Sequence, residues 1–335
     1  MIEIVLGVLA VALVVGAIAE LWLRLRYGLG NPPLYVADAR TGYRLAPNQN
    51  LRRRGNRIAI NQYSMRGPEI ARHRPADTLR VLMLGDSIVN GGWWTDQSEL
   101  LSVKLQAALA RLRPSTNQTV EVLNASANSW GPRNQLGYVL RFGTFEAQMV
   151  VLVLNTDDLF AIAPNSHELG RHPAYPTRRP PLALWEVARR SQKYLPTAEL
   201  QALHDQPGDR VGVNLEAVRQ LHQAVQAAAG QLVMAMTPLR RELEADGPRD
   251  YERLARQRLT DFAAAQGIPY LDFLPRLQQV RYEPLYFDHI HLSAEGNTWV
   301  GQALADFIDQ VGQMPEPGVP SSTSSPADEP LTDLW

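Results

Sequence analysis

A serine lies directly after an apolar run near the start of the main body of the chain. The run 81–84 (VLML) ends at Gly85, and Ser87 follows Asp86. Gly85 permits a tight exit from a strand, so we expect Ser87 at the start of a helix or turn, where backbone N–H groups stabilise negative charge. We expect Asp86 to tie down this turn. A serine hydroxyl is a weak nucleophile until a base accepts its proton, and that base is oriented by a third group.

A base and an orienting carboxylate both occur near the other end of the chain. Asp288 and His291 lie in the segment FDHIHLSAEGN, residues 287–297, just before a predicted helix. Two residues separate them, so a turn can bring the carboxylate under the imidazole. Ser87, Asp288 and His291 therefore supply the three groups of a serine nucleophile system.

Five short apolar runs alternate with amphipathic stretches from residue 79 onward. The runs are 81–84, 121–123, 149–154, 231–236 and 269–273, and the predicted helices are 98–112, 214–229, 249–266 and 295–310. Continuous apolar strands separated by helices predict an α/β fold with a parallel sheet covered on both faces. Such a sheet binds ligands beyond the carboxyl ends of its strands, which is where the polar residues of interest lie.

The G-D-S tripeptide after the first strand, together with D-x-x-H before the last helix, resembles the SGNH/GDSL hydrolase superfamily. The resemblance covers residues 79–310 and implies a flavodoxin-like three-layer α/β/α sandwich with about five parallel strands. It makes Ser87 the nucleophile, His291 the general base and then acid, and Asp288 the residue that orients His291. It also makes the Ser87 N–H one of three donors to the oxyanion.

The motif for the second oxyanion donor departs from the family pattern. The family has a glycine after the second strand, in a pattern like N-x-S-x-x-G. Residues 124–131 read NASANSWG, which puts Ser129 at the glycine position, and Gly131 takes that position in a register shifted by two. A backbone N–H donor needs no particular side chain, so either residue can supply it.

The motif for the third donor also departs. The family shows G-x-N-D after the third strand, whereas residues 155–158 read NTDD, and the best register puts Asp157 at the asparagine position. An ionised carboxylate cannot donate a hydrogen bond and repels an oxyanion. Three resolutions stay open: Asn155 reaches the site in a shifted register, a desolvated Asp157 is protonated, or the site uses backbone donors. Loss of one donor costs about 100- to 1,000-fold in rate.

The N-terminal segment has the composition of a membrane helix. Ile4 to Ala19 is 16 residues without a charge, which spans about 24 Å as a helix, and Leu21 to Leu23 bring it close to the thickness of a bilayer core. We predict a single-pass membrane helix over residues 1–26. A buried helix and a cleaved signal peptide are the alternatives, the latter because residues 17–19 (AIA) resemble a cleavage site.

The charges that flank this helix disagree with the resemblance about the side of the membrane. Arg24 and Arg26 follow the helix, and the positive-inside rule would put the main body in the cytoplasm. Anchored SGNH domains that resemble this one, with a similar E-x-x-L-R stretch, mostly act outside the cytoplasm. We therefore expect an extracytoplasmic, periplasmic catalytic domain.

The remaining segments divide the chain further. We predict a small irregular or β-rich connecting subdomain at 27–78, an SGNH hydrolase-like domain at 79–312 with an insert at 160–210, and a disordered tail at 313–335. The insert is expected to form a lid or a substrate wall.

Three tryptophans after the first two strands either stack on sugar rings or pack under the insert: Trp93, Trp94 and Trp130. Arginines 52–54 and 57 are expected on a solvated strand edge, or against lipid headgroups or an anionic polymer.

Composition excludes several function classes. The chain has 335 residues, 33 basic against 34 acidic side chains and no cysteine. Thiolate catalysis, disulfides and cysteine-ligated metal sites are excluded. The charge balance gives no reason to expect nucleic acid as a partner. Asp288, His289 and His291 are too few for a metal site without a second cluster, and no phosphate-binding glycine motif occurs, so we expect neither a metal nor a cofactor.

Two function classes remain. The first is a membrane-tethered serine esterase or O-acyltransferase that acts through an acyl-enzyme on ester groups, O-acetyl groups above all, of a glycan or other envelope molecule. The second is a non-catalytic binding or assembly subunit of a membrane complex, with a membrane protein as partner. Asp157 favours the second class, and the presence of Ser87, Asp288 and His291 together favours the first.

Overall fold

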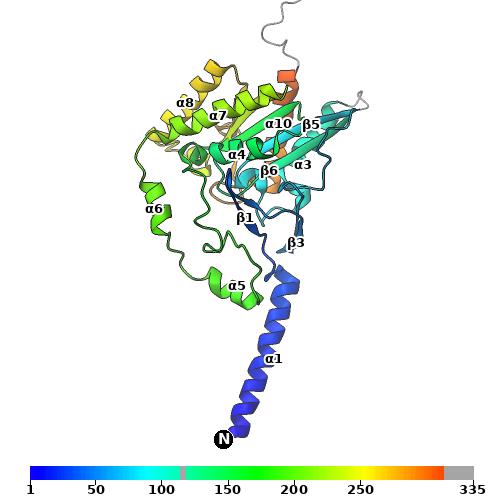
Figure 1. Ribbon diagram of the computed structural model, residues 1–335, viewed down its shortest axis with the longest axis vertical. Coiled ribbons are helices and arrows are strands. Elements are labelled where there is room, and N and C mark those ends of the chain that lie inside the picture. The colour runs from blue at the N-terminus through cyan, green and yellow to red at the C-terminus, as the bar shows by residue number, and fades with distance from the viewer. Residues whose placement is uncertain (114–117, 313–335) are drawn as a thin grey trace, which may run out of the picture.

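The computed structural model describes residues 1–113 and 118–312, so the predicted tail at 313–335 lies outside the described residues. An N-terminal helix leads into two β-hairpins and then into alternating strands and helices (Figure 1). The strands are β1 (Tyr35–Asp38), β2 (Gly42–Leu45), β3 (Gln49–Arg53), β4 (Asn56–Ile60), β5 (Thr78–Gly85), β6 (Thr119–Ser126), β7 (Met149–Asn155), β8 (Gln231–Thr237) and β9 (Tyr270–Asp272). The α-helices are α1 (Ile2–Tyr27), α2 (Ser87–Asn90), α3 (Leu101–Leu112), α4 (Pro132–Phe142), α5 (Ala183–Arg190), α6 (Ala198–Asp205), α7 (Arg210–Ala227), α8 (Asp250–Gln266), α9 (Leu274–Leu277) and α10 (Ala294–Gly312). Short 3₁₀ helices are η1 (Gln97–Glu99), η2 (Thr156–Phe160), η3 (Arg240–Leu243) and η4 (Glu283–Leu285).

The five strands β5 to β9 form one parallel sheet in the order β6-β5-β7-β8-β9. This is the doubly wound order in which the first strand lies between the second and the third. A ligand site is expected at the carboxyl ends of β5 and β7, where the chain connections switch from one side of β5 to the other. The central strands are buried along their whole length, and their side chains alternate between two cores: Leu82 and Leu84 on one face, Val81 and Met83 on the other. The predicted α/β fold class is confirmed.

Helices cover both faces of the sheet. Residues of α4, α7 and α8 fill the core on one face, and residues of α3 and α10 fill the core on the other, where the two helices pack together (Figure 1). The result is a three-layer α/β/α sandwich. The predicted helix over 98–112 begins instead at Leu101, because residues 97–99 form η1, which the Asp96 side chain caps by accepting from the Ser98 N–H at 3.0 Å.

The segment between α1 and β5 forms two β-hairpins, β1-β2 and β3-β4. Its apolar side chains, among them Tyr43 and Ile58, pack into the same core as α4 and α7. Buried Arg66, which follows β4, donates to the backbone oxygens of Asn90 at 2.8 Å, Gly92 at 2.6 Å and Thr95 at 3.0 Å. The segment therefore holds the loop that follows the helix of Ser87.

The arginine-rich strand edge is not uniformly solvated. Arg53 is buried and pairs with Glu186 of α5, while its Nη1 also donates to the Gly28 carbonyl at 2.8 Å. Arg57 is exposed and pairs with Asp96 at 2.9 Å. The prediction of a solvated edge is wrong for Arg53, because the insert folds back over β3 and supplies a buried carboxylate.

Helix α1 stands away from the globular body and has no buried residue (Figure 1). It is long and apolar enough to cross a membrane, a property that anchors and signal sequences share. The helix ends at Gly28, whose φ of 65° lies in the left-handed region and whose N–H donates to the Arg24 carbonyl. The insert at 160–210 follows β7 and η2 and runs as an arc away from the sheet (Figure 1). It passes through α5, which lies beside the end of α1, and returns through α6 to α7.

Candidate active site

Ser87 is held at the first turn of α2, at the carboxyl end of the central strand β5. Asp86 caps this helix, since its Oδ1 accepts from the Ile88 N–H at 2.8 Å. The strand ends at Gly85, where a side chain would not fit, because an added Cβ would lie 2.3 Å from Cγ2 of Val89. The predicted tight exit and the predicted capping role of Asp86 are both found.

A chain of short hydrogen bonds joins Ser87 to His291, which lies 204 positions further along the sequence, and through it to Asp288. The His291 Nε2 lies 2.9 Å from the Ser87 Oγ, and the His291 Nδ1 lies 2.7 Å from the Asp288 Oδ2. In the tautomer that carries its proton on Nδ1, the imidazole donates to Asp288 and accepts from Ser87. A neutral imidazole held in this way can take the proton of a hydroxyl that attacks a carbonyl carbon.

The local backbone fixes Asp288 under His291. The Asp288 Oδ1 accepts from the backbone N–H of Ile290 at 2.9 Å and of His291 at 2.8 Å, so the loop closes on its own carboxylate. Burial raises the pKa of Asp288, but the hydrogen bonds from the His291 ring and from these two N–H groups outweigh it and leave the pKa below its usual value. Asp288 is therefore ionised at neutral pH and stabilises a protonated imidazole.

The tryptophans have other roles than lining the site. The Trp94 ring packs against the His291 ring, with 4.3 Å between centroids, and stacks on Phe287 at 6.2 Å. Trp130 is buried and donates from Nε1 to the Tyr43 carbonyl at 2.9 Å. Trp93 lies under the Arg54 guanidinium. All three are absent from the residues that line the cavity beside Ser87, so Trp94 restrains the imidazole and Trp130 belongs to the core.

A cavity of about 460 Å³ opens beside Ser87 and His291. Its walls come from the ends of β5 and β7, from the loop at 289–291, and from both arms of the insert. The lining residues are Tyr43, Asp86, Ser87, Ser129, Asn134, Asn155, Asp157, Asp158, Phe160, Ala161, Ile162, Ala163, Asn165, Glu168, Leu200, His204, His289, Ile290 and His291. Sequence reasoning missed Tyr43, Glu168 and His204. Only the position of the insert, at the ligand-binding rim, pointed to the last two.

Ser129 and Gly131, the two alternatives for the second oxyanion donor, differ in surroundings. Ser129 lines the cavity with a φ of 58°, a left-handed conformation that favours glycine, which agrees with a register that places it at a glycine position. The Ser129 Oγ hydrogen-bonds the Tyr175 hydroxyl at 2.8 Å. The Gly131 N–H already donates to the Asn134 Oδ1 at 3.0 Å at the start of α4, and Gly131 does not line the cavity.

Asn155 and Asp157, the two alternatives for the third oxyanion donor, also differ in their surroundings. Asn155 is buried at the end of β7, and its side-chain amide donates to the Asp86 Oδ2 at 2.9 Å, an oxygen that lies 3.2 Å from the Ser87 Oγ. Asp157 lies on the exposed wall of the cavity, where its backbone N–H donates to the Asn155 Oδ1 at 2.8 Å. Partial desolvation and the charge of Glu252 raise the pKa of Asp157.

Two buried carboxyl groups lie beneath Ser87. The Asp158 Oδ2 accepts from the Asn155 N–H at 3.0 Å, and Asp86 holds the Asn155 amide from the other side. Burial raises the pKa of both carboxyls, and the negative charge of Asp86 raises the pKa of Asp158 further, well above 3.8. Of the pair, Asp158 is the group that keeps its proton as the pH rises.

Replacing Asp158 by Asn should stabilise the protein at neutral pH. The unfolded carboxyl releases its proton near pH 3.8, whereas the folded one retains it, so the stability of the wild type falls as the pH rises above that value. An Asn side chain keeps an acceptor for the Asn155 N–H without this penalty. Denaturant unfolding of Asp158→Asn and wild type at pH 4 and at pH 8 should therefore show a stability gain that is larger at pH 8.

Asp209 supplies the matched control for this experiment. It is a surface residue, and its hydrogen bonds with Arg258 lower its pKa to about 2. Its contribution is present above pH 3.8 and lost as the pH falls toward 2, so Asp209→Asn should lower the stability at pH 8. A pH-independent effect of Asp158→Asn would contradict the assignment of a retained proton.

The fold and the site together define a class of protein. A doubly wound sheet that carries Ser, His and Asp at its carboxyl edge, beside a cavity, is an arrangement of serine hydrolases. Residues 83–299, more than half of the chain, match the GDSL-like lipase/acylhydrolase family, and the chain belongs to this family of ester hydrolases.

Several solved structures are similar to this chain at low sequence identity. Axe2, an acetylxylan esterase from Geobacillus stearothermophilus, is 14% identical, with 68% of this chain and 93% of that chain covered and a TM-score of 0.45. TesA is 14% identical, with 69% and 99% covered and a TM-score of 0.45. The acetyl xylan esterase AlAXEase is 13% identical, with 69% and 98% covered and a TM-score of 0.44. Among curated proteins, none matches the chain.

Proposed function

We propose that this chain is a membrane-tethered serine esterase or O-acyltransferase of the SGNH type. Ser87 is the nucleophile, His291 the general base and acid, and Asp288 the group that orients and stabilises the imidazole. The observation that carries this proposal is the hydrogen-bond chain from Asp288 through His291 to Ser87, at 2.7 and 2.9 Å, at the edge of a cavity. Membership of a family of ester hydrolases supports it.

The proposed reaction runs through an acyl-enzyme. The Ser87 Oγ attacks the ester carbonyl carbon while the His291 Nε2 takes its proton, and a tetrahedral oxyanion forms. His291 then gives the proton to the leaving alkoxide oxygen as the ester bond breaks. Water or a sugar hydroxyl attacks the acyl-enzyme in the second half, with its proton passing to His291 and then to the Ser87 Oγ. Hydrolysis and transfer differ only in which acceptor the cavity holds.

We propose that the Ser87 N–H, the Ser129 N–H and the Asn155 side-chain amide stabilise the oxyanion. The amide nitrogen of Asn155 carries two N–H groups, and one of them donates to Asp86, which leaves the second for the substrate. With this assignment, Asn155 rather than Asp157 supplies the third oxyanion donor, which is the shifted register of the NTDD motif at 155–158. Asp157 then serves as a wall residue, and its carboxylate need not face the oxyanion.

The charges around the cavity favour an uncharged or cationic ester. Asp157 and Glu168 line it together with His204 and His289, and no arginine or lysine is among its described lining residues. Burial raises the pKa of Glu168. An anionic substrate would meet like charges without a compensating cation. O-acetyl groups on a neutral glycan, or on another uncharged envelope molecule, meet this requirement.

A non-catalytic binding or assembly subunit of a membrane complex is the alternative that Asp157 favours. It receives less support because the Asn155 amide lies beside Ser87 and Asp86 and offers another donor. A binding module would also have no chemical need for a serine, imidazole and carboxylate in hydrogen-bonded sequence.

The full chain in detergent should hydrolyse a short-chain aryl acetate. Ser87→Ala and His291→Ala should each lower kcat by at least about 1,000-fold, and the double variant should lose little more than either single one, because the residues act as a unit. Ser98→Ala, at an exposed serine outside the cavity, is the control and should keep the wild-type rate. Unchanged turnover by Ser87→Ala would contradict the proposal.

Removing a cavity carboxylate should change charge selectivity. Wild type should prefer an aryl acetate over the matching aryl hemisuccinate, and Glu168→Gln should narrow this preference by about 5-fold, or about 1 kcal/mol, the upper end of the range measured for solvent-exposed charge pairs. The measurement is kcat/KM for both esters. Glu199→Gln, in the same insert but outside the cavity lining, should leave the ratio unchanged. An equal effect of both variants would point to a general charge effect instead.

We propose that α1 anchors the chain in a membrane as a single span and that the catalytic domain lies outside the cytoplasm, in the periplasm. A C-terminal fusion tests the side. Alkaline phosphatase fused after Trp335 should be active, because that enzyme needs an oxidising compartment, whereas a fluorescent protein that matures only in the cytoplasm should stay dark. The reverse pattern would place the site in the cytoplasm, as Arg24 and Arg26 suggest.

A further inference from the structure

Helix α5 carries a group of exposed apolar side chains close to the end of α1. The exposed fractions are 49% for Leu182, 39% for Leu184, 58% for Trp185 and 42% for Val187. We call these four residues the α5 patch. The opposite side of α5 faces the body through Ala183 and Glu186, both of which are buried. Leu184 and Trp185 therefore point away from the buried side of α5, while Val187 and Leu182, the residue before the helix, lie on its flanks.

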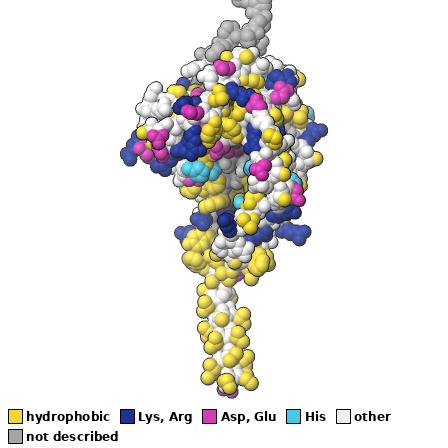
Figure 2. All heavy atoms as spheres, turned by 90° about the vertical axis from the view of Figure 1, so that its left-hand side faces the viewer, with side chains coloured by type: hydrophobic (Ala, Val, Ile, Leu, Met, Phe, Trp, Pro, Cys, Tyr) yellow, Lys and Arg dark blue, Asp and Glu magenta, His cyan; other side chains and the backbone are white. Residues whose placement is uncertain are grey.

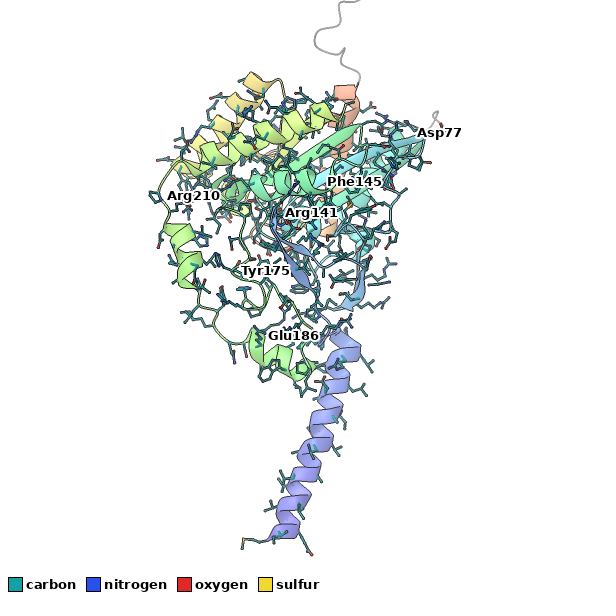
Figure 3. All side chains as sticks on the ribbon, in the orientation of Figure 1. Asp77, Arg141, Phe145, Tyr175, Glu186 and Arg210 are labelled. Atoms are coloured by element: carbon teal, nitrogen blue, oxygen red, sulfur yellow. The ribbon has the colours of Figure 1, made fainter. Side chains whose placement is uncertain are left out.

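Hydrogen bonds fix α5 against the last turns of α1. The two carboxylate oxygens of Glu20 accept from the backbone N–H groups of Ala183 at 2.8 Å and Leu184 at 3.0 Å. Arg24 donates from Nη2 to the Pro181 carbonyl at 2.9 Å. Glu186 accepts from the Gly30 N–H at 2.7 Å and pairs with buried Arg53, and Figure 3 places it where α5 meets the end of α1.

These contacts set the depth of α5 relative to α1. The uncharged stretch from Ile4 to Ala19 has 16 residues, about 24 Å of helix, and a bilayer core is about 30 Å thick. Glu20, the residue that caps α5, follows this stretch directly. A bilayer crossed by α1 would thus have its boundary at the level of the α5 patch.

Aromatic and basic side chains gather at this same level. Trp22 of α1 is 54% exposed, and Trp185, which is 58% exposed, lies on the helix that Glu20 holds against the same end of α1. Exposed tryptophans concentrate at membrane interfaces. Exposed arginines occur on α1 and on the segments that meet its end or lie beside α5: Arg26, Arg52, Arg54, Arg178 and Arg179. Figure 2 shows hydrophobic side chains where the stem widens into the body, with basic side chains directly above them.

The carboxylates in this region are already neutralised by partners. Glu20 accepts from Arg24 at 2.6 Å and Glu186 pairs with Arg53 and Arg190. The exposed arginines therefore carry the net charge of this surface, and that charge suits the anionic headgroups of phospholipids.

We propose that the α5 patch is a second membrane contact, inserted into the boundary between headgroups and acyl chains of the bilayer that α1 crosses. The arginines around it contact anionic headgroups. This inference rests on the proposed anchoring by α1 and is independent of ester hydrolysis. The occupant is the bilayer because the patch continues the apolar surface of α1 at the depth where that helix leaves the hydrocarbon.

Membrane contact by α5 would also fix one wall of the cavity. Helix α5 lies in the insert between Glu168 on one side and Leu200 and His204 on the other, and all three residues line the cavity. Contact of the α5 patch with the bilayer would thus restrain both arms of the 160–210 insert. The cavity would then lie at a fixed height above the bilayer.

The absence of cysteine allows a direct test with single-cysteine variants of the full chain. Val187→Cys reports on the α5 patch, Val14→Cys on α1, and Leu254→Cys, an exposed apolar position on α8, is the matched control. Each variant is labelled with an environment-sensitive fluorophore and reconstituted into vesicles of phosphatidylcholine and phosphatidylglycerol. Quenching by lipids with a shallow or a deep spin label measures membrane depth.

We expect the fluorophore at Val187→Cys to lose intensity with the shallow label and that at Val14→Cys with the deep label, while Leu254→Cys is unaffected. Reversing two charges, Arg178→Glu with Arg179→Glu, should reduce quenching at position 187 and leave position 14 unchanged. Quenching at 14 with none at 187 overturns this inference but keeps the anchor, and a blue shift at 187 without lipid quenching assigns the patch to a protein partner or a second copy. Absence of quenching at 14 overturns the anchor and this inference together.

Discussion

The hydrogen-bond chain Asp288–His291–Ser87 is the constraint on which the rest of the molecule depends. Its members come from opposite ends of the main domain and meet at 2.9 and 2.7 Å. The sheet presents Ser87 at the carboxyl end of β5, and the loop before α10, closed by the Tyr286–Leu292 bridge, brings Asp288 and His291 to it. The buried, alternating strands β5 and β7 keep that edge rigid, and the N-terminal hairpins add to it through Arg66, which holds the loop after α2. In the proposed mechanism this rigidity keeps the hydroxyl within reach of its base.

The negative charges at the site are controlled in two ways, one for Asp288 under His291 and one for the buried pair beneath Ser87. Asp288 stays ionised because the His291 ring and two backbone N–H groups donate to it, which is the state that stabilises an imidazolium. Asp86 and Asp158 lie in a buried pair bridged by Asn155, where desolvation and mutual repulsion favour a retained proton on one of them. A carboxylate beside an oxyanion would oppose the reaction, and in the proposed mechanism the Asn155 amide, which hydrogen-bonds to Asp86 and lines the cavity, supplies the donor that Asp157 in the NTDD motif does not.

Apolar runs and helical periodicity were sufficient to predict the sheet and both helical layers. The meeting of Ser87 with His291 was expected from the family resemblance that G-D-S and D-x-x-H carry. Contacts between segments far apart in the chain were not predictable. Arg53 is buried because Glu186 of the insert reaches it, and Trp130 is a core residue because its indole N–H finds the Tyr43 carbonyl. Glu168 and His204 line the cavity through the course of the insert, which local patterns do not encode. The motif registers likewise did not decide between Ser129 and Gly131 as the second oxyanion donor, or between Asn155 and Asp157 as the third.

The central claim is that the hydroxyl of Ser87 is activated by His291. Treating the folded full chain with a fluorophosphonate, which reacts with activated serine hydroxyls and leaves others unmodified, measures this without knowledge of the natural ester. Peptide mass spectrometry should find one adduct, on Ser87, and His291→Ala should abolish it. A folded protein that remains unlabelled, or that is labelled on another serine, would contradict the account.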